Sequence, residues 1–184
     1  MRSPWFWPAA VVLIAVAGCS PRATDRASGT AADSSGSTVA TPVVVPVTAQ
    51  DVMALATRPG QRATLVNVWA TWCAPCKEEF PTLLRVARER ERDGLRLVLI
   101  SADFEDQLPA VHRFLAQQGV TDTTYLETGG EMVFINTLSP KWTGALPATF
   151  VYDRRGRLTD FWEGKADSAR FSRSIDASLA SQSP

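Results

Sequence analysis

The sequence predicts an α/β domain in which a mixed β-sheet is sandwiched between helices. Residues 64–69 and 95–101 are nearly continuous apolar runs, as expected for central strands covered on both faces. A helical pattern lies between them, and two short segments at 148–152 and 157–162 flank a turn and predict a hairpin. Strands alternating with helices and followed by a hairpin indicate a layered α/β architecture.

The first elements of the domain can be placed from local signals. Residues 43–47 predict a short strand, and Pro46 favours the sheet edge because proline cannot donate to a strand ladder. Residues 49–56 predict a helix that ends before a Pro-Gly pair. The chain then enters the buried strand at 64–69.

The central helix is expected from residue 74 to about 93. Its apolar residues recur at i, i+3, i+4 and i+7, charged residues occupy the other side, and Gly94 ends it. Downstream patterns predict a helix at 107–118, a short strand at 125–126, and helices at 131–137 and 168–179.

The first 19 residues have the features of a secretory signal. A basic start precedes an apolar run at 9–17, and small residues lead to Cys19. Val-Ala-Gly-Cys resembles the bacterial lipobox, so we expect lipid attachment at Cys19. An ordinary cleaved signal and an uncleaved anchor are the alternatives, and all three place the domain outside the cytoplasm, in the bacterial cell envelope.

Composition distinguishes a linker from the folded domain and argues against nucleic acid as a partner. Residues 20–41 are rich in Ser, Thr, Ala and Gly and predict a flexible tether, whereas residues 42–184 form the predicted domain. The 19 Lys and Arg residues balance 19 Asp and Glu residues, and no basic stripe is present. Nucleic-acid binding is therefore not expected.

Two cysteines, Cys73 and Cys76, follow the buried strand and open the central helix. The helix dipole and free backbone N–H groups there stabilise a Cys73 thiolate. Thiol pKa values fall from about 8.5 to roughly 3.5–7.5 in such Cys-X-X-Cys motifs. We interpret the pair as a thiol–disulfide exchange centre, with Cys73 the exposed nucleophile and Cys76 the deeper resolving thiol. A static structural disulfide is the alternative.

Two longer stretches make the motif more specific. Residues 67–81 read Asn-Val-Trp-Ala-Thr-Trp-Cys-Ala-Pro-Cys-Lys-Glu-Glu-Phe-Pro, and residues 144–151 read Gly-Ala-Leu-Pro-Ala-Thr-Phe-Val. From about residue 43 to 179 the chain resembles the thioredoxin superfamily, specifically its membrane-anchored TlpA/ResA type. The resemblance implies a thioredoxin-like fold with a central mixed β-sheet sandwiched by helices. It also implies a TlpA-type αβ insert at roughly 103–127.

The resemblance implies roles for residues around the cysteines. Pro147 aligns with the cis-proline of the fold, which holds the backbone of Leu146 beside the cysteines for hydrogen bonding to an extended substrate. Trp72 is expected as an exposed platform beside Cys73. Ala74 and Pro75, between the cysteines, are expected to border the substrate groove and to tune the reduction potential, and Pro75 suits the first helical turn.

Glu79 is the candidate proton carrier. It lies three residues after Cys76, so it can face the motif, and in the resembling family an acid at this position adjusts the thiol pKa values. A solvated surface glutamate is the alternative. Asn67 occupies the position of thioredoxin's buried acid and cannot titrate, which shifts the proton-carrying role toward Glu79.

The predicted function is that of an extracytoplasmic thiol–disulfide oxidoreductase that reduces envelope proteins, for example in cytochrome c maturation. The resemblance implies a transmembrane electron donor of the DsbD/CcdA type, disulfide or dithiol protein substrates, and a membrane anchor through the N-terminal lipid. No bound cofactor or metal is expected, because the Cys73–Cys76 pair is itself the redox centre.

Three other functions stay open from the residues alone. A thiol oxidase or isomerase would use the same pair in the opposite direction, as decided by its reduction potential. A copper-binding metallochaperone would use the soft thiolates, but related proteins have a different cysteine spacing and a histidine, whereas His112 is expected at the surface or edge of a helix far from the motif. A peroxidase would need its reactive cysteine in another sequence context.

Overall fold

The computed structural model describes residues 42–181. Its centre is a six-stranded sheet in the order β1-β4-β3-β2-β5-β6. The predicted signal, tether and lipid-attachment residue Cys19 lie outside the described residues, so the proposed division at residues 19 and 41 stays a prediction.

The predicted elements are all present within the described part, with small shifts at their ends. The strands are β1 (Val44–Val47), β2 (Ala63–Trp69), β3 (Leu95–Ser101), β4 (Thr124–Glu127), β5 (Ala148–Asp153) and β6 (Leu158–Glu163). The helices are α1 (Ala49–Ala56), α2 (Ala74–Glu91), α3 (Leu108–Gln117), α4 (Glu131–Leu138) and α5 (Ser168–Ala180), with a 3₁₀ turn at Glu105–Gln107 before α3.

The sheet is mixed, as predicted. β1 pairs with β4, β4 with β3, and β3 with β2 in parallel, whereas β5 pairs antiparallel with both β2 and β6. β1 lies at the sheet edge, which agrees with its proline. Residues 103–127, the predicted insert, form the 3₁₀ turn, α3 and β4, and β4 lies between β3 and β1.

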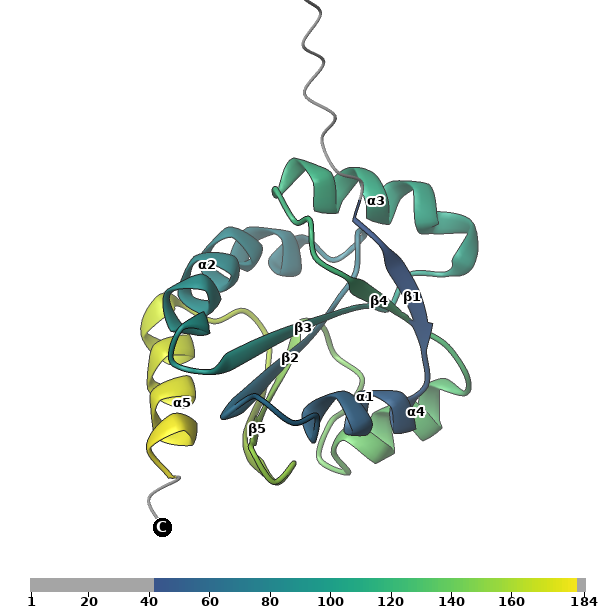
Figure 1. The fold of residues 1–184 in the computed structure, drawn as a ribbon. Helices are drawn as coiled ribbons and strands as arrows, with labels where there is room; N and C mark the ends of the chain where they lie inside the picture. Colours follow the sequence, from purple (N-terminus) through teal and green to yellow (C-terminus); the bar gives the residue numbers. More distant parts are fainter. Residues whose placement is uncertain (1–41, 182–184) are drawn as a thin grey trace, which may run out of the picture. The chain divides into compact units, whose positions relative to one another are not determined.

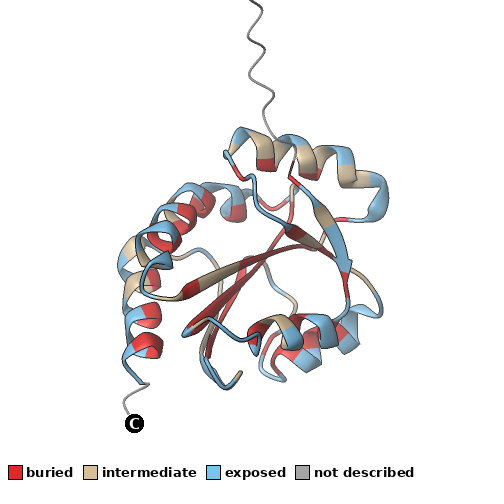
Figure 2. Cartoon of the chain, viewed as in Figure 1, coloured by how far each residue is buried: buried red, intermediate tan, exposed pale blue. Residues whose placement is uncertain are grey.

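Helices cover both faces of the sheet (Figure 1). The helices α2, α3 and α5 contribute to one apolar cluster with side chains of β2, and α1 and α4 contribute to the other. The strands between these layers are mostly buried, whereas the outer sides of the helices are exposed (Figure 2). Each central strand therefore buries both of its faces, which explains its continuous apolar sequence.

Three aromatic rings fix α2 and α3 against β2. Trp69, the last residue of β2, lies 5.0 Å from the ring of Phe80 on α2 and 4.9 Å from the ring of Phe114 on α3, measured between ring centroids. Phe80 and Phe114 lie 4.9 Å apart in an edge-to-face arrangement, the geometry that aromatic pairs favour. This packing sets the position of the first turns of α2, where the cysteines lie.

Candidate active site

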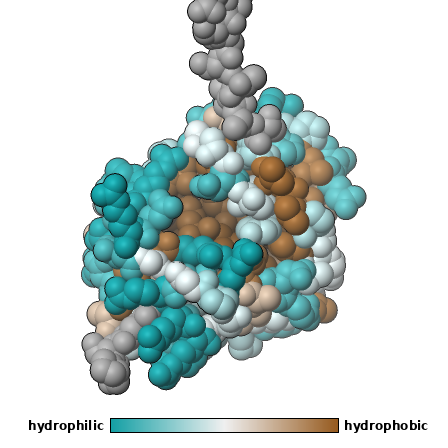
Figure 3. Space-filling model, viewed as in Figure 1, coloured by the Kyte–Doolittle hydropathy of each residue, from teal (hydrophilic) through white to brown (hydrophobic). Residues whose placement is uncertain are grey.

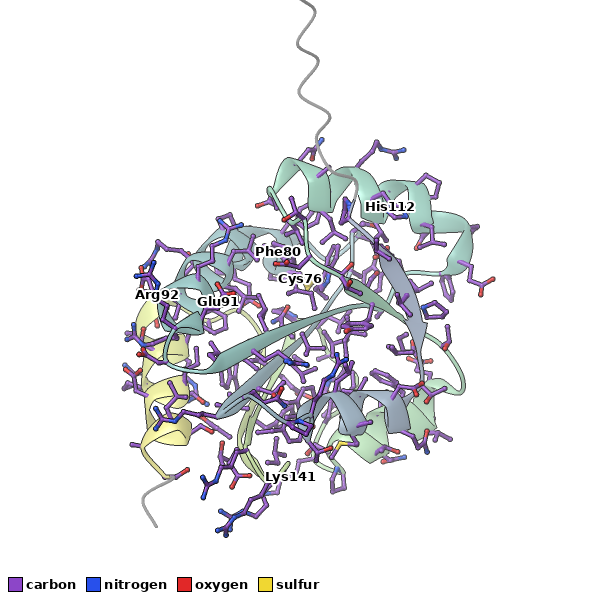
Figure 4. All side chains as sticks on the ribbon, in the orientation of Figure 1. Cys76, Phe80, Glu91, Arg92, His112 and Lys141 are labelled. Carbon is purple, nitrogen blue, oxygen red and sulfur yellow. A yellow bond between two sulfur atoms is a disulfide. The ribbon has the colours of Figure 1, made fainter. Side chains whose placement is uncertain are left out.

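Cys73 and Cys76 form a disulfide at the start of α2, with their Cα atoms 5.3 Å apart. Cys73 is the N-cap residue in extended conformation, and its Sγ accepts a hydrogen bond from the backbone N of Cys76 at 3.2 Å. Figure 4 shows Cys76 near the middle of the molecule, close to Phe80. An N-cap sulfur faces the unpaired N–H groups and the positive end of the helix dipole, so a Cys73 thiolate is stabilised there.

The expectation that Cys73 is exposed was wrong for this disulfide form. The residue is only 5% exposed, and Cys76 is fully buried. Both belong to the apolar cluster that includes Trp69 and Phe80, and Leu146 packs against that cluster. The disulfide joins the Cys73 side chain to its buried partner, Cys76. Trp72, immediately before it, is 59% exposed, as expected for a platform residue.

Glu79 is buried rather than a solvated surface glutamate. Its side chain lies one turn after Cys76, and the residue is 2% exposed. Its Oε1 accepts a hydrogen bond from Asn67 Nδ2 at 3.1 Å, and its Oε2 accepts one from the backbone N of Ala166 at 2.8 Å. Burial raises the pKa of Glu79, while these two hydrogen bonds and the charge of Lys165 oppose the rise. A carboxyl held in this way can gain a proton closer to neutral pH than an exposed one can.

Asn67, which was predicted only to replace thioredoxin's buried acid, makes two side-chain hydrogen bonds in this site. It is 1% exposed, and its Nδ2 donates both to Glu79 and to Thr149 Oγ1, the latter at 3.0 Å. The signal was present in the sequence, because one amide interrupts an otherwise apolar strand on the face shared by Leu65 and Trp69. The contact with Ala166 had no such signal, since a backbone N–H carries no residue identity.

The Leu146–Pro147 peptide bond is cis, as the sequence predicted. The Pro147 carbonyl accepts a hydrogen bond from the backbone N of Gly164 at 2.8 Å, and the indole Nε1 of Trp142 donates to the Ala145 carbonyl at 2.9 Å. Trp142 therefore both packs in the second apolar cluster and holds the segment leading to Leu146. The β6–α5 connection thus contacts two parts of the site, because Gly164 donates to Pro147 and Ala166 donates to Glu79.

A groove of about 400 Å³ lies next to this site. Trp72 and Leu146 line it, together with apolar side chains of β2 and α4, whereas Ala74 and Pro75 are exposed in the first turn of α2 and do not line it. Four carboxylate residues line the groove and no Lys, Arg or His does; the acidic residues are Asp103, Glu105, Glu127 and Glu131. Burial, and then the charge of Glu131, raise the pKa of Glu127.

A second cleft, of about 340 Å³, lies between the later turns of α2 and the start of β3. Figure 3 shows an apolar hollow in this region, bordered by hydrophilic residues. Leu84, Leu97 and Leu99 are among its lining residues. Neither cysteine lines it, so this cleft is separate from the redox pair.

Within residues 42–181, no group of three or more His, Cys, Asp and Glu residues is placed to hold a metal ion. No helix in the same range is long and apolar enough to cross a membrane. His112 lies on α3, away from Cys76 (Figure 4). It is half-buried, as expected at the edge of a helix surface.

Comparison with known proteins decides the family. The AhpC/TSA family model matches residues 40–161, well over half of the chain. The chain belongs to the AhpC/TSA family. This membership, together with the fold, confirms the predicted thioredoxin-like resemblance.

Proteins similar to this chain include thiol-disulfide oxidoreductases and interchange proteins. The chain is 30% identical to the thiol-disulfide oxidoreductase ResA of Bacillus subtilis over 53% of this chain and 50% of ResA. It is 31% identical to the thiol:disulfide interchange protein HelX of Rhodobacter capsulatus over 63% of this chain and 60% of HelX. The chain thus spans half to three fifths of these relatives. A thiol:disulfide interchange protein structure from Chlorobium tepidum superposes with a TM-score of 0.57 at 28% identity, covering 68% of this chain and 83% of that one.

The raised pKa of Glu79 predicts how stability depends on pH. A carboxyl that binds its proton more tightly in the folded state stabilises fully below its ordinary value of 4.5, and this contribution is lost as pH rises through the folded pKa. Glu79→Gln lacks this proton, so its free energy of unfolding should rise relative to wild type across that window, by at most about 1.4 kcal/mol per pH unit. Urea unfolding of the oxidised protein at several pH values measures the difference.

Glu78→Gln is the matched control on the same helix. The hydrogen bond and charge of Lys165 lower the pKa of exposed Glu78, so the stability from that pair is present at high pH and lost as pH falls. The two variants should therefore deviate from wild type with opposite signs. A Glu79→Gln difference that stays flat with pH would contradict a buried, titrating Glu79.

Proposed function

We propose that this protein is a thiol–disulfide oxidoreductase. The proposal rests on one observation above all: Cys73 and Cys76 share a disulfide at the N-terminus of α2, where the helix favours a Cys73 thiolate. The names of ResA and HelX support the same chemistry. A disulfide with a purely structural role would not need a buried acid one turn away or the cis-proline segment beside it.

In the reducing direction, the Cys73 thiolate attacks one sulfur of a partner disulfide. A Cys73–partner bond forms, and the partner's other sulfur leaves as a thiolate. Cys76 then loses its proton and attacks Cys73 Sγ, which forms the Cys73–Cys76 disulfide and releases the second partner thiolate. Two electrons pass to the partner, and its two thiolates take up two protons from the medium, which balance the one released when Cys73 ionised and the one lost by Cys76. The oxidising direction reverses each step.

Glu79 takes the Cys76 proton in this scheme. Its carboxylate lies one turn after Cys76 and its pKa is raised by burial, so it can accept a proton and later return it near neutral pH. Lys165, paired with Glu78 at 2.7 Å, favours the ionised form that must be present before transfer.

Glu79→Gln should slow thiol–disulfide exchange because glutamine cannot accept the Cys76 proton. We expect a loss of about 10²-fold in rate, the lower end for general acid–base catalysis. Stopped-flow reduction of a model disulfide, with Cys73 alkylation rates measured in parallel, checks this. Glu78→Gln serves as the control that should retain the rate. An unchanged rate and unchanged thiol titration in Glu79→Gln would remove Glu79 from the mechanism.

The similar proteins and the N-terminal sequence support a proposal for where the protein acts in the cell. We propose an extracytoplasmic protein of the cell envelope, lipid-anchored through Cys19, that receives two electrons from a transmembrane thiol carrier of the DsbD/CcdA type. Its substrates are disulfides of envelope proteins, for example during cytochrome c maturation. An oxidase or isomerase would use the same residues, and the reduction potential of the pair distinguishes these directions. No bound cofactor enters the proposed reaction.

The groove gives the partner a chemical description. Trp72 and Leu146 present apolar surface to the groove, and its lining also carries four carboxylate residues and no Lys, Arg or His. A partner segment could bury apolar side chains near its cysteine against the apolar surface of the groove. Its basic side chains would then pair with the carboxylates. We therefore propose basic, extended polypeptide segments as preferred substrates.

Disulfide-containing peptides that differ only in flanking Lys or Glu test this preference. The Lys peptide should react about tenfold faster in kcat/KM at low salt, and the ratio should shrink as salt is added. The double variant Glu105→Gln, Glu131→Gln should reduce the ratio, whereas Glu91→Gln, on the far part of α2 in Figure 4, should not. Equal rates for both peptides would refute charge selection by the groove.

Cys76→Ser identifies the partner directly. Without the resolving thiol, the mixed disulfide on Cys73 cannot close and should accumulate in cells, where mass spectrometry identifies the attached protein. Cys73→Ser is the control and should trap nothing. If neither variant captures a disulfide-linked protein under oxidising growth, thiol exchange with envelope proteins is the wrong function.

A further inference from the structure

The side chain of Asn67 has one free end inside the protein. Its Nδ2 donates to Glu79 Oε1 and to Thr149 Oγ1, whereas its Oδ1 is buried without a hydrogen-bond partner among the described residues. Buried polar atoms in native proteins are nearly always paired, so an unpaired acceptor in a central strand calls for a reason.

The two neighbours of the amide can each reverse their hydrogen bonds. An ionised carboxylate only accepts, but a neutral carboxylic acid has an O–H that donates, and a threonine hydroxyl does either. The two ends of an asparagine amide have nearly the same shape. A half-turn of the Asn67 amide would therefore place Oδ1 where it accepts from both Glu79 and Thr149.

The other partner of Glu79 fixes where its proton resides. The backbone N of Ala166 can only donate, so Oε2 must act as an acceptor in both protonation states. The carbonyl oxygen of a carboxylic acid is a better acceptor than its O–H oxygen, so the neutral acid places its carbonyl on Oε2, toward Ala166, and its O–H on Oε1, the oxygen that faces Asn67.

We propose that Asn67 is a positioning residue that holds Glu79 in both protonation states, because its amide turns over when Glu79 gains or loses the proton and the Thr149 hydroxyl reverses with it. The amide then has an unpaired end in both orientations, the oxygen in one and the NH₂ group in the other. This inference rests on the proposed role of Glu79 as the proton carrier in thiol exchange.

The charged surroundings of Glu79 do not replace this role. Among the described residues, Lys165 and Glu78 form an exposed ion pair near it, and the cysteine pair precedes it on α2. The side chains facing it from β2 and β5, Asn67 and Thr149, are neutral. The amide is thus the side-chain contact that can follow the Glu79 proton without adding a charge of its own.

Nuclear magnetic resonance of the oxidised wild-type protein tests the proposal. Above the pKa of Glu79, followed by its carboxyl ¹³C shift, the Asn67 side-chain N–H protons should show Overhauser contacts to Thr149. Below that pKa these contacts should be lost, with the same midpoint. Asn67→Leu identifies the amide signals by their absence. Contacts that persist through the whole titration would overturn the inference.

Glu79→Gln gives a second, pH-independent reading. Its amide oxygen must accept from Ala166, so its NH₂ faces Asn67 and should hold the Asn67 amide in the turned orientation at every pH. Contacts between the Asn67 N–H protons and Thr149 in this variant would contradict the proposal. If Glu79→Gln instead shows the turned amide but exchanges thiols at the wild-type rate, the proton-carrying function fails while the amide inference stands.

Asn67→Leu also separates positioning from packing. Leucine fills the site but neither donates to the carboxylate nor accepts from the acid, so exchange should slow by about tenfold, the order of one hydrogen bond to a charged group. The acid limb of its pH–rate profile should move to higher pH, because the carboxylate loses a donor. A wild-type pH–rate profile in a folded Asn67→Leu protein would refute the role.

Discussion

The packing of α2 across β2 is the constraint on which the site depends. Phe80 and Trp69 are fully or almost fully buried and contact each other, so the rotation of α2 about its axis is fixed. With that rotation set, the helix start places Cys73 at the N-cap, and the next turn directs Glu79 toward the face of β2 that carries Asn67. One aromatic contact thus determines the positions of a redox pair and its acid.

The electrostatics of the site combine two opposed effects. The N-terminus of α2 favours negative charge on Cys73, whereas burial disfavours negative charge on Glu79. In the proposed exchange, the thiol that ionises first lies where ionisation is favoured, and the acid that takes a proton lies where protonation is favoured. Both residues are buried, so the helix N-terminus at Cys73 and the desolvation of Glu79 act on two proton affinities in opposite directions.

Much of this could be predicted from the sequence, for physical reasons specific to each feature. The apolar run of β2 and the stripe of α2 reveal burial directly, and the cis-proline at position 147 followed from a recognisable local motif. The predicted exposure of Cys73 was wrong, because its burial depends on an apolar cluster assembled from distant parts of the chain, which a local motif does not reveal. Asn67 was predicted to differ from thioredoxin's buried acid, but its contact with Glu79 was not predicted. The alternation of side chains along β2 shows which residues share a face, but it does not show which helix residue packs against them. The Gly164 and Ala166 contacts were beyond sequence patterns because backbone atoms make them.

The β6–α5 connection links the cis-proline segment to Glu79 through two backbone hydrogen bonds. Gly164 holds the carbonyl of Pro147, and two residues later the N–H of Ala166 holds the carboxylate of Glu79. In the proposed function, a substrate segment that hydrogen-bonds beside Leu146 meets a backbone that is linked, through residues 164–166, to the carboxylate of Glu79. Because both bonds are made by backbone N–H groups, side-chain changes in this connection can alter its charge, as at Lys165, while the link itself is kept. The geometry of the acid is thereby joined to that of the groove, even though the groove residues and Glu79 come from different elements of the fold.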